Sequence, residues 1–184
     1  MMWLLMAPAM LNAQQLNKTA VNTVPLHSIH NNSSFTLKQT GARFVALVFI
    51  SPECPLSQNY MLTLNHLQIK FDGKLTVIGI FPGSAFKDDV YLNFEKKYGV
   101  IFKLLKDEKK LLVKKLGASI TPEVFLLDSS RQVIYSGAID DWVVSLGKKR
   151  KNISEHFLND AMEQSFAGQQ VQPARTKAIG CFIN

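Results

Sequence analysis

Short unbroken hydrophobic runs and amphipathic stretches follow one another along the chain. Two runs, at residues 44–50 and 75–81, are rich in Val, Ile and Phe and are bounded by turn residues, which is typical of strands buried on both faces. Between them, apolar residues recur at spacings of three and four over residues 57–71. This spacing predicts a helix, which Asp72 and Gly73 would end.

The same criteria predict the remaining elements. Helices are expected over residues 86–98, 108–116 and 153–166, short strands over 35–38 and 100–105, and a hairpin made by 124–127 and 133–137. Strands that alternate with helices, followed by a terminal hairpin and helix, predict an α/β fold. We expect a mixed central sheet that helices cover on both sides.

Four segments are expected along the chain. Residues 1–15 are predicted to be a signal peptide and residues 16–34, rich in Asn, Thr and Ser, a polar lead-in segment. Residues 35–167 would form the folded domain. Residues 168–184 would form a tail that contains Cys181.

The signal-peptide prediction rests on an apolar, uncharged core from Trp3 to Leu11 and on Ala13, a small residue of the kind that precedes a cleavage point. The segment departs from the usual pattern because no Lys or Arg precedes the core. An apolar N-terminus of a cytosolic protein is the alternative. Export would place the protein in the periplasm or outside the cell, where cysteines can pair. No stretch is long enough for a transmembrane helix.

Composition and charge limit the classes of partner that the protein is expected to bind. The 184 residues are 47% hydrophobic and 19% charged, as in ordinary globular domains, and carry a net charge of +7. Lysines cluster within residues 95–115 and 148–151. Because the aromatic and Arg-rich patterns of base-reading proteins are missing, we interpret these clusters as solvated faces and expect no nucleic-acid partner.

Cys54 stands at the most informative point of the pattern. It follows the first buried run, and the predicted helix begins directly behind it, with Pro55 suited to the first helical position. The unpaired N–H groups and dipole of a helix N-terminus favour thiolate over thiol, so this arrangement predicts a reactive cysteine. The alternative is a small buried cysteine in a strand–helix corner.

Two motifs resemble a known family. VALVFISPECPLS resembles the strand, loop, active-site cysteine and helix start of thioredoxins, and ITPEVFLLDSSRQVIYSG resembles the cis-proline segment and hairpin of exported thioredoxins. Residues 35–166 therefore resemble a thioredoxin-fold protein of the redoxin group, which includes peroxiredoxins and exported thioredoxin-like proteins. The resemblance implies a thioredoxin-like fold, an antioxidant or oxidoreductase activity, and Pro122 beside Cys54. It also implies that Thr121 presents its backbone to a bound thiol substrate. The Gly-Cys pair near the end of the chain resembles a redoxin subgroup that finishes in Gly-Cys.

Departures from the family pattern limit the prediction. Thioredoxins carry Cys-x-x-Cys, whereas Ser57 occupies the fourth place here, so Cys54 has no neighbouring sulfur to resolve a mixed disulfide. Peroxiredoxins need one cysteine in a Thr- or Ser-x-x-Cys pattern, which Ser51 satisfies. However, Leu47 replaces their proline, and Arg131 and Arg150 are the only candidates for their arginine.

Cys181 is the second cysteine, and three interpretations of it stay open. It could form a redox disulfide with Cys54, act as an independent thiol that is free or paired between chains, or share a site for a soft ion such as Cu(I). The four histidines do not stand at ligand spacing from either cysteine: His27, His30, His66 and His156. No metal site or cofactor is assigned.

The leading hypothesis is an exported thiol–disulfide oxidoreductase. Cys54 would be the nucleophile, Ser57 a hydrogen-bond donor to its thiolate, and Cys181 a resolving partner. Pro122 would position the substrate, and Pro55 and Thr121 would contact it. The partner would be a protein thiol or disulfide, or a small peroxide. The alternatives are a carrier of a metal ion or client thiol that performs no catalysis, and a peroxiredoxin-like peroxidase.

Overall fold

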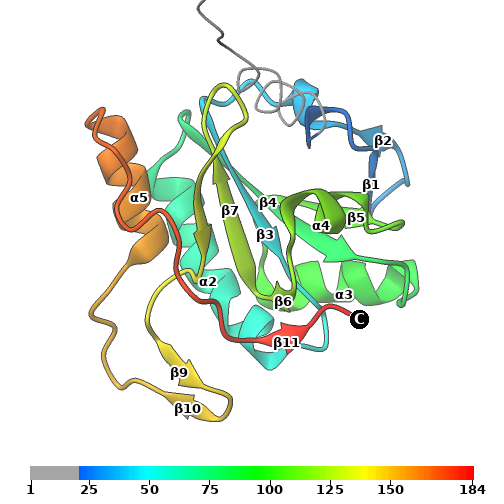
Figure 1. Ribbon diagram of the computed structural model, residues 1–184. Coiled ribbons are helices and arrows are strands. Elements are labelled where there is room, and N and C mark those ends of the chain that lie inside the picture. Colours follow the sequence, from blue (N-terminus) through cyan, green and yellow to red (C-terminus); the bar gives the residue numbers. More distant parts are fainter. Residues whose placement is uncertain (1–20) are drawn as a thin grey trace, which may run out of the picture.

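A seven-stranded mixed sheet forms the centre of the computed structural model, which describes residues 21–184 (Figure 1). Its strand order is β2-β1-β5-β4-β3-β7-β8. The bounds are β1 Leu26–Ser28, β2 Ser34–Phe35, β3 Phe44–Phe49, β4 Leu75–Pro82, β5 Lys103–Asp107, β7 Glu123–Leu127 and β8 Val133–Gly137. β3, β4 and β5 are parallel, whereas β7 and β8 continue the sheet as an antiparallel hairpin. The predicted mixed α/β architecture is confirmed.

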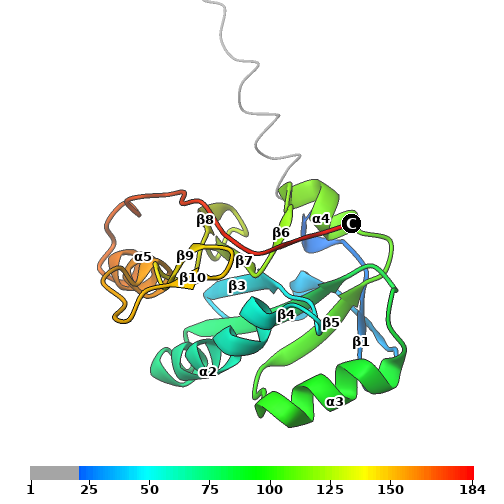
Figure 2. The ribbon, with the colours of Figure 1, turned by 90° about the horizontal axis from the view of Figure 1, so that it is seen from below.

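Helices cover both faces of the sheet because the central strands are apolar on both sides. Along β3, Ala46 and Val48 face a cluster with α2 (Pro55–Lys70), α3 (Asp88–Tyr98) and α5 (Phe157–Phe166). Val45 and Leu47 face the opposite cluster, which includes α4 (Leu111–Leu116) and the 3-10 helix η1 (Leu37–Gln39). Figure 2 shows α2 and α3 on one side of the sheet and α4 on the other.

The N-terminal part of the described chain differs from the predicted elements. The strand expected over residues 35–38 is wrong beyond Phe35, because Thr36 and Gln39 form a capping box that begins η1. Residues 26–28, within the segment expected to be a lead-in, pair with β5 and extend the sheet. A three-residue strand is too short to show a hydrophobic period, so the pattern could not reveal it.

Two small sheets were not predicted. β9 (Val143–Ser145) and β10 (Lys148–Lys149) form a hairpin that projects from the body of the molecule (Figure 1). β11 (Cys181–Phe182) pairs with β6 (Ile120–Thr121), and thereby brings the C-terminal segment back to the central sheet. Within residues 21–184, no helix has the length and hydropathy needed to span a membrane. The predicted signal peptide lies outside the described residues.

Candidate active site

Cys54 is the residue immediately before α2. It serves as the N-cap with extended backbone angles, and Pro55 takes the first helical position as expected. Its N–H donates to the Ser51 carbonyl oxygen over 3.2 Å, which turns the chain from β3 into the helix. The cysteine therefore sits where the end of a buried strand meets a helix N-terminus.

Ser57 and Thr121 approach the same sulfur. Cys54 Sγ donates to the carbonyl oxygen of Thr121 over 3.1 Å, and the Thr121–Pro122 peptide bond is cis. Ser57 is fully buried in the first turn of α2, and hydrogen bonding from its backbone and its side chain lowers the pKa of Cys54. The Ser57 hydroxyl oxygen also accepts from the N–H of Ser51 over 3.2 Å. The helix start and the loop carrying Pro122 thus converge on Cys54.

The C-terminal segment completes the site from the other side. β11 is antiparallel to β6, with Cys181 opposite Thr121, and the Thr121 hydroxyl donates to the Cys181 carbonyl oxygen over 3.3 Å. Gly180 makes this approach possible, since a Cβ there would lie 2.1 Å from the Thr121 carbonyl oxygen. The Cys181 thiol consequently reaches hydrogen-bonding contact with the Cys54 thiol, and neither cysteine is in a disulfide.

The two thiols have opposite acidities. Burial raises the pKa of Cys54, but hydrogen bonds from the Cys181 thiol and from Ser57 outweigh it and leave the pKa below its ordinary value. For Cys181, burial and the hydrogen bond and charge of Cys54 all act in one direction and raise the pKa to about 12. Cys54 therefore ionises first, with Cys181 as its proton-bearing donor.

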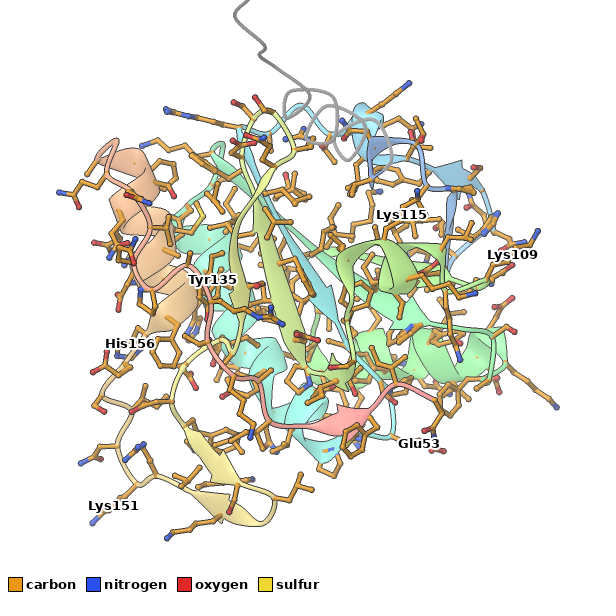
Figure 3. The ribbon with its side chains drawn as sticks, in the orientation of Figure 1. Glu53, Lys109, Lys115, Tyr135, Lys151 and His156 are labelled. Carbon is orange, nitrogen blue, oxygen red and sulfur yellow. The ribbon has the colours of Figure 1, made fainter. Side chains whose placement is uncertain are left out.

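A cavity of about 450 Å³ adjoins the two sulfurs. Cys54 is only 2% exposed, but it lines this cavity together with Cys181. Glu53, also a lining residue, is exposed, and Figure 3 shows it beside the C-terminal segment. Aromatic walls from β4, from α3 and from the loop between them were not anticipated from the sequence, because their pattern indicates only core positions: Phe81, Tyr91 and Phe86.

Other candidate residues lie elsewhere. Arg131 donates to the carbonyl oxygens of Thr40 and Ala42, at the end of β3 remote from Cys54. Arg150 forms an ion pair with Asp141 over 3.1 Å and does not line the cavity at Cys54. Within the described chain, no three His, Cys, Asp or Glu side chains gather as a metal site would require.

A buried polar pair next to Pro122 was missed by sequence reasoning. The Tyr60 hydroxyl donates to Asp140 Oδ1 over 2.5 Å, and both residues are buried and line a second cavity together with Pro122. Burial raises the pKa of Asp140 despite the hydrogen bonds from Tyr60 and from the Trp142 N–H. The Tyr60 ring packs edge-on against Trp142 at 5.5 Å. Residues 140–142 therefore have a structural role: Asp140 and Trp142 respectively hydrogen-bond to and pack against Tyr60.

Comparison with known families agrees with this geometry. The profile of the AhpC/TSA family matches residues 18–136, which make up more than half of the chain and include Cys54 and Pro122. The chain belongs to the AhpC/TSA family. The resemblance to thioredoxin-fold redoxins is thereby confirmed. The relation to a subgroup ending in Gly-Cys stays a prediction, because the match ends before Gly180. A comparison with curated proteins finds no matching sequence.

Solved structures show the same fold. A hypothetical protein from Sinorhizobium meliloti 1021 is 27% identical, with a TM-score of 0.76 over 86% of this chain and 88% of that one. A secreted disulfide oxidoreductase from Mycobacterium tuberculosis is 15% identical, with a TM-score of 0.54 over 62% and 82%. The Xanthomonas campestris bacterioferritin comigratory protein, described for alkyl peroxide reduction, is 20% identical, with a TM-score of 0.55 over 64% and 80%. The chain is thus similar in fold to both disulfide oxidoreductases and peroxiredoxins.

Proposed function

We propose that this protein is a thiol–disulfide oxidoreductase in which Cys54 is the nucleophile and Cys181 the resolving thiol. The observation that carries the proposal is the hydrogen-bonding contact of two free thiols with opposite acidities at the start of α2. A nucleophile needs a lowered pKa, and a resolving thiol must reach the sulfur that the nucleophile occupies. The missing second cysteine of the Cys-x-x-Cys pattern is then supplied by β11.

The reaction follows from the order of ionisation. The Cys54 thiolate attacks one sulfur of a substrate disulfide, forms a mixed disulfide and expels the other sulfur as a thiolate. The Cys181 thiol then loses its proton and attacks Cys54 Sγ, so that the second substrate sulfur leaves and the Cys54–Cys181 bond forms. The substrate gains two electrons and two protons, and the two protein thiols lose them. An external dithiol restores the reduced protein.

The neighbouring groups have defined roles in this scheme. Ser57 donates two hydrogen bonds that stabilise the Cys54 thiolate, and Pro55 leaves the helix N-terminus open toward it. The Thr121 carbonyl oxygen accepts from the Cys54 thiol and fixes the direction of the sulfur. Pro122 holds the loop that carries this carbonyl next to the substrate.

Disulfide exchange is favoured over peroxide reduction by the surroundings of Cys54. Ser51 lines the cavity at the position expected for a peroxiredoxin, but neither Arg131 nor Arg150 does. Without a cation at the thiolate, a bound peroxide would lack electrostatic activation.

The secreted mycobacterial protein of similar fold and the apolar N-terminal segment support action in the periplasm or outside the cell.

Mass spectrometry of the reduced protein tests the proposal directly. Treatment with bis(2-hydroxyethyl) disulfide is expected to join Cys54 to Cys181 within one chain. The Cys181→Ser protein is expected to retain one 2-mercaptoethanol adduct on Cys54, because no second thiol displaces the adduct. The Cys54→Ser protein is expected to form an adduct more slowly, because its remaining thiol, Cys181, has a raised pKa. An unlinked wild-type protein with both thiols free would leave the carrier alternative instead. Peroxide consumption equal to disulfide reduction would favour the peroxidase.

A further inference from the structure

The strand edge next to Cys54 is already occupied. β6 pairs with β11 in a two-stranded sheet, and the Ile183 N–H extends the contact by donating to the Ser119 carbonyl oxygen over 2.9 Å. Lys110 Nζ donates to the Asn184 carbonyl oxygen and holds the segment beyond the strand. A protein client that docks as an added strand needs a free edge, so it would have to displace this whole segment.

Access to the sulfurs remains through the cavity. Its volume of about 450 Å³ falls in the range of sites for small molecules, and the exposed residues Ala85 and Phe182 lie among its lining residues. Phe182 is 77% exposed, so it borders the opening and does not fill the interior. A small molecule can therefore reach Cys54 while β11 stays paired with β6.

The chemistry of the walls selects what can enter. Phe81, Phe86, Tyr91 and Ile50 provide apolar surface beside the cysteines, and Glu53 is the one Asp, Glu, Lys or Arg among the described lining residues. An apolar group gains free energy by leaving water for such walls. A carboxylate would lose hydration among these apolar walls, and Glu53 would repel it.

We infer that the substrate of this site is a small, uncharged, apolar disulfide that binds in this cavity, and not a protein segment. The inference rests on the proposed function and adds the substrate class. A dialkyl disulfide places its alkyl groups against the aromatic walls and one sulfur at Cys54. Its reduction by the two thiols follows the steps given above and yields two alkyl thiols and the Cys54–Cys181 disulfide.

Three probe disulfides with dithiothreitol as reductant test this class. Dipropyl disulfide and 3,3′-dithiodipropionate have the same number of carbons between sulfur and chain end, but the second carries two carboxylates. After correction for their uncatalysed rates with dithiothreitol, kcat/KM is expected to favour dipropyl disulfide by about tenfold or more. Extension from diethyl to dipropyl disulfide should raise kcat/KM by up to about fourfold per methylene that enters the cavity. Insulin disulfides should be reduced more slowly than dipropyl disulfide.

A charge placed at the opening provides a matched variant. Ala85→Asp adds a carboxylate to a lining residue, and Ser84→Asp adds the same charge to an exposed neighbour that does not line the cavity. Ala85→Asp is expected to lower kcat/KM for dipropyl disulfide by about tenfold, and Ser84→Asp by less than about twofold. The inference would be overturned if Ala85→Asp and Ser84→Asp had equal effects on kcat/KM, or if dipropyl disulfide and 3,3′-dithiodipropionate were reduced at equal rates. It would also be overturned if insulin were reduced faster than dipropyl disulfide. In each of these cases the oxidoreductase function would still stand. Absence of any Cys54-dependent reduction would overturn both.

Discussion

At the scale of the residue, the pairing of Cys54 with Cys181 decides the order of events. The hydrogen bond that lowers the pKa of Cys54 is one of the contributions that raise the pKa of Cys181. The hydrogen bond and the negative charge of Cys54 cease to raise the pKa of Cys181 once Cys54 is joined to a substrate sulfur, because Cys54 is then no longer a thiolate. Cys181 then ionises more easily at the step in which it must attack.

Ser57→Ala tests the stabilisation of the thiolate. Loss of the hydroxyl removes a hydrogen bond that lowers the pKa of Cys54, so the pKa rises and less thiolate is present at pH 7. The pH profile of iodoacetamide alkylation, measured in the Cys181→Ser background, should move its midpoint to higher pH. Ser165→Ala removes another buried serine hydroxyl, in α5, and serves as the control. A midpoint that does not move would contradict the role of Ser57.

At the scale of the element, β11 is a short strand whose position depends on one glycine. Cβ atoms are excluded at Gly180 by the Thr121 carbonyl, which is backbone and cannot turn aside. The Gly-Cys pair at the end of the chain therefore has a steric explanation. It lets a two-residue strand lie close enough to β6 for the Cys181 thiol to reach Cys54.

Gly180→Ala is expected to displace β11. Alkylation of Cys54 by a reagent too large to enter the cavity, in the Cys181→Ser background, should become faster by about tenfold, a factor equivalent to ~1.4 kcal/mol of lost strand docking. In the protein with both cysteines, formation of the Cys54–Cys181 disulfide should slow. Gly41→Ala is the control, since a Cβ there meets open space and its backbone is not left-handed. An unchanged alkylation rate would show that β11 does not shield Cys54.

Tyr60→Phe tests the corner that supports the loop of Pro122. Removal of the hydroxyl leaves the Asp140 carboxyl buried without one of its donors, which costs about 1–3 kcal/mol of unfolding free energy. Urea denaturation at pH 7 measures the loss. The double variant Tyr60→Phe, Asp140→Asn should recover part of it, because the buried charge is removed. If the free energy of unfolding lost in the double variant equals the sum of the losses in Tyr60→Phe and Asp140→Asn, the two side chains do not interact.

At the scale of the whole molecule, the two cysteines connect the middle of the chain to its C-terminal segment. The segment between them includes β4, β5, β7 and β8 of the central sheet, the helices α2 to α5 and the β9–β10 hairpin. Oxidation would therefore close a loop of roughly 130 residues around the fold. Redox state and global stability should be linked.

The oxidised protein is expected to be more stable than the reduced protein by about 2–4 kcal/mol, because the disulfide restricts the unfolded chain. Urea denaturation with and without dithiothreitol measures the difference. Cys181→Ser cannot form the bond and should show one stability under both conditions. A wild-type protein equally stable in both states would imply that Cys54 and Cys181 do not pair.

Local sequence patterns were sufficient to predict the central sheet, the long helix and the position of Cys54. The runs at residues 44–50 and 75–81 and the spacing in 57–71 are local patterns, and burial on both faces of a parallel sheet leaves a strong hydrophobic signal. The strands β1 and β2 left none, because they are too short to show a period.

The tertiary structure alone decided the partnership of the two sulfurs. Cys181 and Cys54 are distant in sequence, and spacing could not choose among a redox pair, an independent thiol and a shared ion site. Their contact arises because β11 pairs with β6, which depends on the close approach of Gly180 to Thr121. The apolar cavity likewise joins residues of β4, α3 and the C-terminal segment. Long-range packing, and not local propensity, brings these groups together.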